Sequence, residues 1–480
     1  MTGDRAHRFA GWPAVAASLA LAVLQLLVFA PHIMKGRAVE FLWAGTAGPV
    51  YRADGLALTL GVVWALAGAL AAAAGQGHVE MAPDRATMRH QGRVVLMCVG
   101  LISMAYARQP MAFFAGWEVA GLALWLAAGR RGLAQAPVVH APGALLLVMV
   151  VGGLIPPFAP PAGGIAQPWP TAVAVAMGLI VLMRSGIWPF DGWVRAVVDD
   201  GRRGGPGAGM LTGIYVMAAP CLPAKALVAA PWDLLGTWVL ALVGMAGLFG
   251  LSLNVVGLRG HARLGKFSVL AGLAAGAVVG FGLAPGSALA GAGAVMLVLA
   301  GTVWAAAPSA PRALGFGGAL AGMWLVSQGA LDLRYGLVGA ALVPMLALVM
   351  LAAGRRDVQQ APGKPHMGTA SGYAYALAIV AIAGLTLMAV YPQAVMELAA
   401  RPAVQAMAGG VGALTAVEVD RGLGLLVRSS QQVVLAALPA SGMAVAVLLA
   451  TVALYWLRRV AARFMVGPHS DGPFVRKARK

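Results

Sequence analysis

Apolar runs long enough to span a bilayer recur from one end of the sequence to the other. A helix crosses the roughly 30 Å hydrocarbon core of a membrane with about 20 apolar residues, and the runs in this chain are close to that length. Hydrophobic residues make up 60% of the 480 residues, whereas charged residues make up only 10%. A water-soluble fold would leave much of this apolar surface in contact with water. The sequence therefore predicts an all-α, polytopic membrane protein.

We predict about 14 transmembrane helices from the apolar stretches that charged residues, proline or glycine bound. The first run is longer than the core of a signal peptide and lacks a clear cleavage signature, so we expect a retained helix. The 65 glycines and the abundant alanine suit helices that pack closely in lipid. The predicted spans lie near residues 10–30, 55–75, 93–107, 110–128, 143–159, 171–189, 207–229, 233–256, 266–283, 286–306, 313–331, 335–353, 371–391 and 432–457.

The net charge of +18 comes from basic residues that cluster between the apolar runs. Lysine and arginine concentrate in the cytoplasmic loops of membrane proteins. With a cytoplasmic N-terminus, most of the 34 Lys and Arg residues fall in inner segments, and Lys225 is among the few that fall in outer segments. This alternation predicts an even number of helices with both termini in the cytoplasm. Membrane topology thus explains the basic charge, and we expect no nucleic-acid partner.

One predicted helix carries a carboxylate within the apolar segment "FFAGWEVAGLALWLAAG", residues 113–129. Glu118 lies too deep in this span for its short side chain to reach water easily. An ionisable group inside the membrane is costly, which makes it a candidate for function. We predict that Glu118 binds and releases a proton. The alternative is a protonated glutamate that only hydrogen-bonds a neighbouring helix.

A second ionisable residue, Arg184, lies near the end of the span at 171–189. Gly186 and Pro189 follow it and are able to break the helix within the membrane. A broken helix is tolerated where its free backbone groups line a cavity. The alternative is that the Arg184 side chain extends to the lipid headgroups.

Signatures of soluble enzymes and redox proteins are missing from the sequence. There is no P-loop, HExxH or CxxC motif, and Cys98 and Cys221 show no metal-ligand spacing with histidine. No haem-ligand pair or flavin motif is evident. We therefore expect no cofactor and no metal site, and a non-catalytic membrane subunit.

Four segments resemble motifs of the antiporter-like membrane subunits of respiratory complex I, Mrp antiporters and membrane hydrogenases. "YRADGLALTL" (51–60) resembles "RxDGLS" at the entry to a helix, and "GWEVAGLALWL" (116–126) resembles the segment with the family's buried glutamate. "RSGIWPFDGWVRAVVDD" (184–200) is similar to "KSAxxPxHxWLPDAMEAP", and "GMLTGIYVM" (209–217) is similar to "MVTAGVYLL". The motifs occur in the family's order from residue 51 to about residue 220.

The resemblance implies two inverted five-helix repeats that contain broken helices. It places Glu118 at the buried glutamate, Arg184 at the buried lysine and Asp199 at an acidic position, with Glu118 and Arg184 as the first ion pair of a proton path. It also implies a place among other subunits of a proton-translocating complex in a prokaryotic inner membrane. The implied divisions are 1–92, N-terminal helices and a cytoplasmic loop; 93–232, the first repeat; 233–391, a second, degenerate repeat; and 392–480, an outer amphipathic segment or ordered loop, a last helix and a basic tail.

The chain also departs from the family's pattern. Arginine replaces lysine at position 184, and a guanidinium does not release a proton in proteins. "RRGGPGAGM" (202–210) lacks the family's histidine, and "GAGAVMLVLAGTVWAAA" (291–307) lacks its lysine. Gln328, in "GMWLVSQGAL" (322–331), stands near a further lysine or glutamate position. These losses predict reduced or lost transport by this chain.

Three functions are consistent with these residues. The leading one is an antiporter-like subunit of a multi-subunit, proton-translocating assembly of the complex I type. The second is the membrane subunit of an inorganic-carbon pump, which pairs a related subunit with a zinc-containing soluble protein. The third is a structural scaffold without transport. A partner with iron–sulfur cysteines favours the first function, and a carbonic-anhydrase-like partner favours the second.

Overall fold

The computed structural model describes part of the first two thirds of the chain. The chain divides into two compact units, Met1–Gly422 and Leu423–Lys480, and all described residues belong to the first. The described residues are 12–35, 37–42, 48–76, 85–127, 136–158, 168–187, 190, 192–194, 197, 207–255, 265–285, 287–306, 319, 322, 323, 325 and 326.

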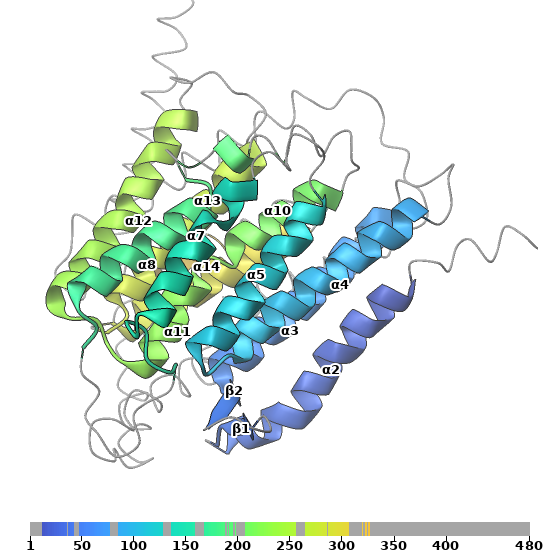
Figure 1. Ribbon diagram of the computed structural model, residues 1–480, viewed down its shortest axis with the longest axis horizontal. Coiled ribbons are helices and arrows are strands. Elements are labelled where there is room, and N and C mark those ends of the chain that lie inside the picture. The colour runs from blue at the N-terminus through green and yellow to red at the C-terminus, as the bar shows by residue number, and fades with distance from the viewer. Residues whose placement is uncertain are drawn as a thin grey trace, which may run out of the picture. The chain divides into compact units, whose positions relative to one another are not determined.

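The described residues form helices that pack on one another, together with one short hairpin (Figure 1). The hairpin pairs β1 (Val39–Leu42) with β2 (Pro49–Ala53) in antiparallel register. The helices are α2 (Trp12–Met34), α3 (Gly55–Gln76), α4 (Arg85–Tyr106), α5 (Pro110–Ala127), α7 (Ala136–Val151), α8 (Thr171–Arg184), α10 (Gly207–Met217), α11 (Cys221–Ala229), α12 (Leu234–Val255), α13 (Gly265–Leu283) and α14 (Ala288–Ala306).

Four helical segments are long and apolar enough to cross a membrane: Pro13–Ile33, Gly55–Ala73, Pro110–Ala127 and Gly209–Ala229. The last of these segments is completely buried within the protein, whereas the first is mostly exposed. Leu24 and Leu27 of α2 are among its exposed large side chains. An exposed apolar stripe on a spanning helix is the surface that lipid or another subunit covers.

The predicted spans up to residue 306 fall on observed helices, with three differences. The span at 143–159 is shifted, because α7 begins at Ala136 and ends at Val151. The span at 207–229 is divided between α10 and α11, and the β1–β2 hairpin was not predicted. The spans at 335–353, 371–391 and 432–457, most of 313–331 and the segment 392–431 lie outside the described residues.

Glycines bring α4 and α5 unusually close together. A Cβ at Gly100 would lie 2.6 Å from the backbone nitrogen of Ala120, and a Cβ at Gly116 would lie 2.6 Å from the carbonyl oxygen of Gly100. No side chain fits at either position, so the two backbones are in contact. Small residues allow such contacts between membrane helices. This contact fixes the turn of α5 that carries Trp117 and Glu118.

The "RADG" motif caps α3 next to the hairpin. The Asp54 carboxylate accepts a hydrogen bond of 2.8 Å from the backbone N–H of Ala57, which is the usual role of aspartate before a helix. Arg52 of β2 lies 3.6 Å from the Glu40 carboxylate, and Arg108 pairs with the same carboxylate at 2.6 Å. These ion pairs attach the hairpin to the start of α5.

Candidate functional site

Glu118 is held by a histidine from the neighbouring helix. Its carboxylate lies 2.7 Å from Nδ1 of His140, which is in the second turn of α7. The side chains of Glu118 and His140 are 30% and 33% exposed. A single short hydrogen bond therefore joins two protonatable groups, and both side chains are partly exposed.

A glycine one turn after His140 makes room for the carboxylate. A Cβ at Gly143 would overlap with Oε1 of Glu118 and would lie 2.9 Å from its Cδ. Residues three apart on a helix share a face, so His140 and Gly143 both face Glu118. On α5, a Cβ at Gly121 would lie only 3.2 Å from Cε1 of His140. The two glycines let the imidazole and the carboxylate approach each other between the helices.

Arg184 is completely buried and stacked between two aromatic rings. Its guanidinium carbon lies 3.6 Å from the ring centroid of Trp117 and 4.0 Å from that of Tyr215. Its Nε is 3.4 Å from the Tyr215 carbonyl oxygen, and its Nη2 is 3.9 Å from the sulfur of Met104. Cation–π contacts are strongest when the cation is removed from water. The two rings are therefore the principal partners of this charge.

The structure does not form the predicted direct ion pair between Glu118 and Arg184. Among the described residues, the carboxylate is paired with His140, and no nitrogen of Arg184 lies within 4.0 Å of it. The guanidinium is nevertheless within electrostatic range of Glu118, because Trp117 contacts Arg184 and precedes Glu118 in the chain. The alternative of an Arg184 side chain reaching the headgroups is wrong, since its exposure is 0%.

The helix that carries Arg184 ends at this residue. Ser185 caps α8, and Gly186 has φ of +60°, a backbone conformation that favours glycine. The Trp193 ring then returns to α8 and donates a hydrogen bond of 3.0 Å to the Met183 carbonyl oxygen. The predicted end of the helix beside a buried arginine is therefore observed.

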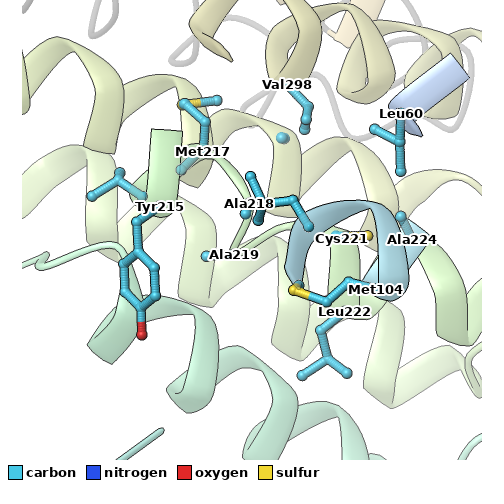
Figure 2. Packing of buried hydrophobic residues seen from close by; sticks show 14 of the residues in the cluster. Leu60, Met104, Tyr215, Met217, Ala218, Ala219, Cys221, Leu222, Ala224 and Val298 are labelled. Carbon is cyan, nitrogen blue, oxygen red and sulfur yellow. The ribbon is translucent and has the colours of Figure 1, made fainter. Parts of the chain in front are cut away.

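Figure 2 shows the core where α10 ends and α11 begins. Cys221 and Leu222 pack there with Met104 of α4, while the Tyr215 ring extends away from this turn. The Tyr215 hydroxyl donates to the Val139 carbonyl oxygen at 3.4 Å. Tyr215 thus joins the arginine of α8 to the turn of α7 that carries the histidine.

The prediction did not include His140 and misplaced Lys225. His140 lies just before the predicted span at 143–159. Its position in the apolar segment "APVVHAPG" is the sequence feature that could have identified it as a site residue. Lys225 was predicted in an outer segment, but it lies in α11 with an exposure of 0%. Its Nζ has no hydrogen-bond partner among the described residues.

The other predicted site residues lie elsewhere or are not described. Asp199 and Gln328 are outside the described residues. Within the part of the chain that the structure describes, no three His, Cys, Asp or Glu side chains are placed to hold a metal ion.

Comparison with known proteins gives structural matches only. No family model matches the sequence, and no curated protein matches it. A chain of the Mrp complex from Dietzia sp. DQ12-45-1b superposes with a TM-score of 0.65 at 15% identity over 97% of this chain and 58% of that chain. A chain of the membrane-bound sulfane sulfur reductase, an archaeal respiratory membrane complex, superposes with a TM-score of 0.59 at 12% identity over 82% of this chain and 74% of that chain.

The chain therefore shares the fold of these two membrane-complex chains. It spans a little over half of the length of the Mrp chain that it matches. Both neighbours are subunits of multi-subunit membrane complexes. The antiporter-like resemblance of the four sequence motifs is confirmed at the level of the fold.

Proposed function

We propose that this antiporter-like chain is a subunit of a multi-subunit assembly of the complex I type that translocates protons across a prokaryotic inner membrane. The chain would contribute the helices that carry the ion and no redox cofactor. Its partners would be other membrane subunits and peripheral subunits, and both termini would lie in the cytoplasm. The assignment rests on the shared fold and on the ionisable groups that α5, α7 and α8 bring together.

In this proposal Glu118 is the group that takes up and releases the proton. The main support for this role is the position of the carboxylate in the middle of an apolar span. It is hydrogen-bonded at 2.7 Å to His140, a second protonatable group, and lies within electrostatic range of the buried Arg184. A nearby positive charge favours the ionised carboxylate. A change in the distance between Glu118 and Arg184 would therefore change the affinity of the carboxylate for its proton, which couples movement to proton binding.

Arg184 supplies a fixed charge in this proposal. A guanidinium keeps its proton in proteins, so it influences Glu118 without relaying protons. The proposal also includes about 14 helices in two inverted repeats. Two residues outside the described part of the chain belong to it: Asp199 as an acidic group of the first repeat, and Gln328 in a second repeat with reduced transport.

The test is Glu118→Gln in the assembled complex, reconstituted in sealed vesicles. We expect normal assembly and at least a tenfold lower proton flux, because the amide does not carry a proton between helices. Glu40→Gln changes the same chemical group in the hairpin and is the matched control, expected to retain flux. Normal flux in assembled Glu118→Gln complexes would instead support the scaffold function. Co-purified partners distinguish a redox assembly from an inorganic-carbon pump.

A further inference from the structure

We infer that His140 is a second proton-binding group of this site, and that Glu118 and His140 bind and release protons as one unit. The inference rests on the proposed function of Glu118 and adds a residue and a mechanism to it. It follows from the geometry of α5 and α7, where the carboxylate faces an imidazole and the buried cation faces two aromatic rings.

The two cations near Glu118 differ in their chemistry. Arg184 is fully buried and permanently charged, so the number of protons it holds does not change. Histidine is the side chain whose ordinary titration falls between about pH 5 and 8. Of the two groups, only His140 is able to exchange a proton with Glu118.

A single hydrogen bond accounts for the exchange. In one state Nδ1 of His140 carries a proton and donates it to the ionised carboxylate, and Nε2 carries the second ring proton. Transfer along the 2.7 Å bond gives a neutral carboxylic acid that donates to a neutral imidazole, with no change in the total number of protons. Loss of the Nε2 proton from the first state leaves a carboxylate beside a neutral ring that still donates through Nδ1. The unit thus holds or releases one proton while the hydrogen bond between helices persists.

The two sides of the Glu118–His140 pair differ in exposure and charge. Glu118 and His140 are each about a third exposed, whereas Arg184 on the inner side has no exposure. The charged or titratable groups near the pair are Arg184 from α8 and Tyr215 from α10, among the residues that the structure describes. The fixed guanidinium repels a proton on the buried side, so in this inference the pair exchanges its proton on its exposed side.

Tyr215 and Gly143 hold Glu118 and His140 in these positions. The Tyr215 ring covers Arg184, and its hydroxyl donates to the carbonyl oxygen of Val139, the residue before His140. Gly143 leaves space for the carboxylate on the same face of α7. Both residues position the pair and take no part in the proton transfer itself.

The experiment compares the pH dependence of proton flux in complexes that carry His140→Gln, His140→Lys or no substitution. We expect flux in the unsubstituted complex to depend on pH, because the pair exchanges a proton. We expect His140→Gln to lower flux about tenfold and to remove that dependence, because glutamine hydrogen-bonds without exchanging a proton. His140→Lys keeps a charge but lacks the imidazole that shares the proton, so it should also lose the dependence. His90→Gln, on α4, is the control and should keep it.

A purely structural role for His140 predicts a different result. His140→Gln would then lower flux at every pH by the same factor and leave the shape of the profile unchanged, and this outcome would overturn the inference. A native profile in His140→Lys would also overturn it.

Infrared difference spectra of the purified chain separate this inference from the proposed function. The carbonyl band of a protonated carboxyl group that disappears in Glu118→Gln reports on this residue alone. We expect the band to change in two pH steps in the unsubstituted chain and in one step in His140→Gln, because coupled groups titrate as a pair. If the infrared band changes in two pH steps but Glu118→Gln does not alter proton flux, the pairing of Glu118 with His140 is supported and its role in transport is refuted. If the band changes in a single pH step in both the unsubstituted chain and His140→Gln, the inference that the two groups titrate as a pair is refuted.

Discussion

Gly143→Ala is a small change that should disconnect Glu118 from His140. The added methyl group would overlap with Oε1 of Glu118 and would also lie 3.4 Å from Cδ1 of Trp117. Trp117 is fully buried and packed against Arg184, so it has little room to move. We expect the carboxylate to be displaced from Nδ1 of His140.

The size of the effect follows from the lost hydrogen bond. A hydrogen bond to a charged group contributes about 1.5 to 3 kcal/mol. Because both side chains are about a third exposed, solvent screening reduces this to about 1 kcal/mol. That energy corresponds to a roughly fivefold weaker association of the carboxylate with the histidine. We therefore expect Gly143→Ala to reduce proton flux by roughly fivefold and to flatten its dependence on pH.

Gly92→Ala is the matched control for this substitution. Gly92 lies within α4, and a Cβ there would meet no atom within 4 Å. Both alanines raise helix propensity by up to about 1 kcal/mol, so neither should weaken its helix. Flux is measured in sealed vesicles at several pH values and normalised to assembled complex. Equal, unchanged profiles in Gly143→Ala and Gly92→Ala would refute the reasoning, because the carboxylate would then not need its position beside His140.

Three further predictions concern stability, measured by unfolding the purified chain in mixed detergent micelles. Trp117→Leu and Arg184→Met should show a coupling energy of about 2 kcal/mol in a double-mutant cycle, because each removes the same buried cation–π contact; additive effects would contradict this. Lys225→Met should raise the free energy of unfolding by about 1 kcal/mol or more, since the Lys225 amine is buried without a hydrogen-bond partner among the described residues; a fall would show that Lys225 has a partner. Asp233→Ala should cost about 1 to 2 kcal/mol, because its carboxylate caps α12 at Gly236 and accepts from Thr171 at the start of α8; an unchanged chain would contradict that role.

The sequence predicted those helices whose ends are marked by charge or proline. The α5 span was predicted at 110–128 and is observed at Pro110–Ala127, between Arg108 and a basic segment. The α7 span was misplaced because His140 and Pro142 resemble the end of an apolar run, although the helix includes both. The short β1–β2 hairpin has too few residues to show a clear alternation of polar and apolar side chains.

The sequence identified the two charged residues of the candidate site but not the contacts between its four helices. Glu118 and Arg184 stand out because charge is rare in apolar spans, and both lie at the site. Which side chain pairs with which depends on how α5, α7, α8 and α10 are rotated against one another, and one sequence does not record these rotations. The aromatic partners of Arg184 also could not be distinguished from ordinary core residues, since Trp117 and Tyr215 lie in apolar stretches.

The central claim is that the Glu118 carboxylate carries a proton through this chain. Proton flux per assembled complex in Glu118→Gln, compared with Glu40→Gln under the same conditions, tests it most directly. The proposal predicts that flux falls at least tenfold in Glu118→Gln and remains in Glu40→Gln. Full flux in correctly assembled Glu118→Gln complexes would contradict it.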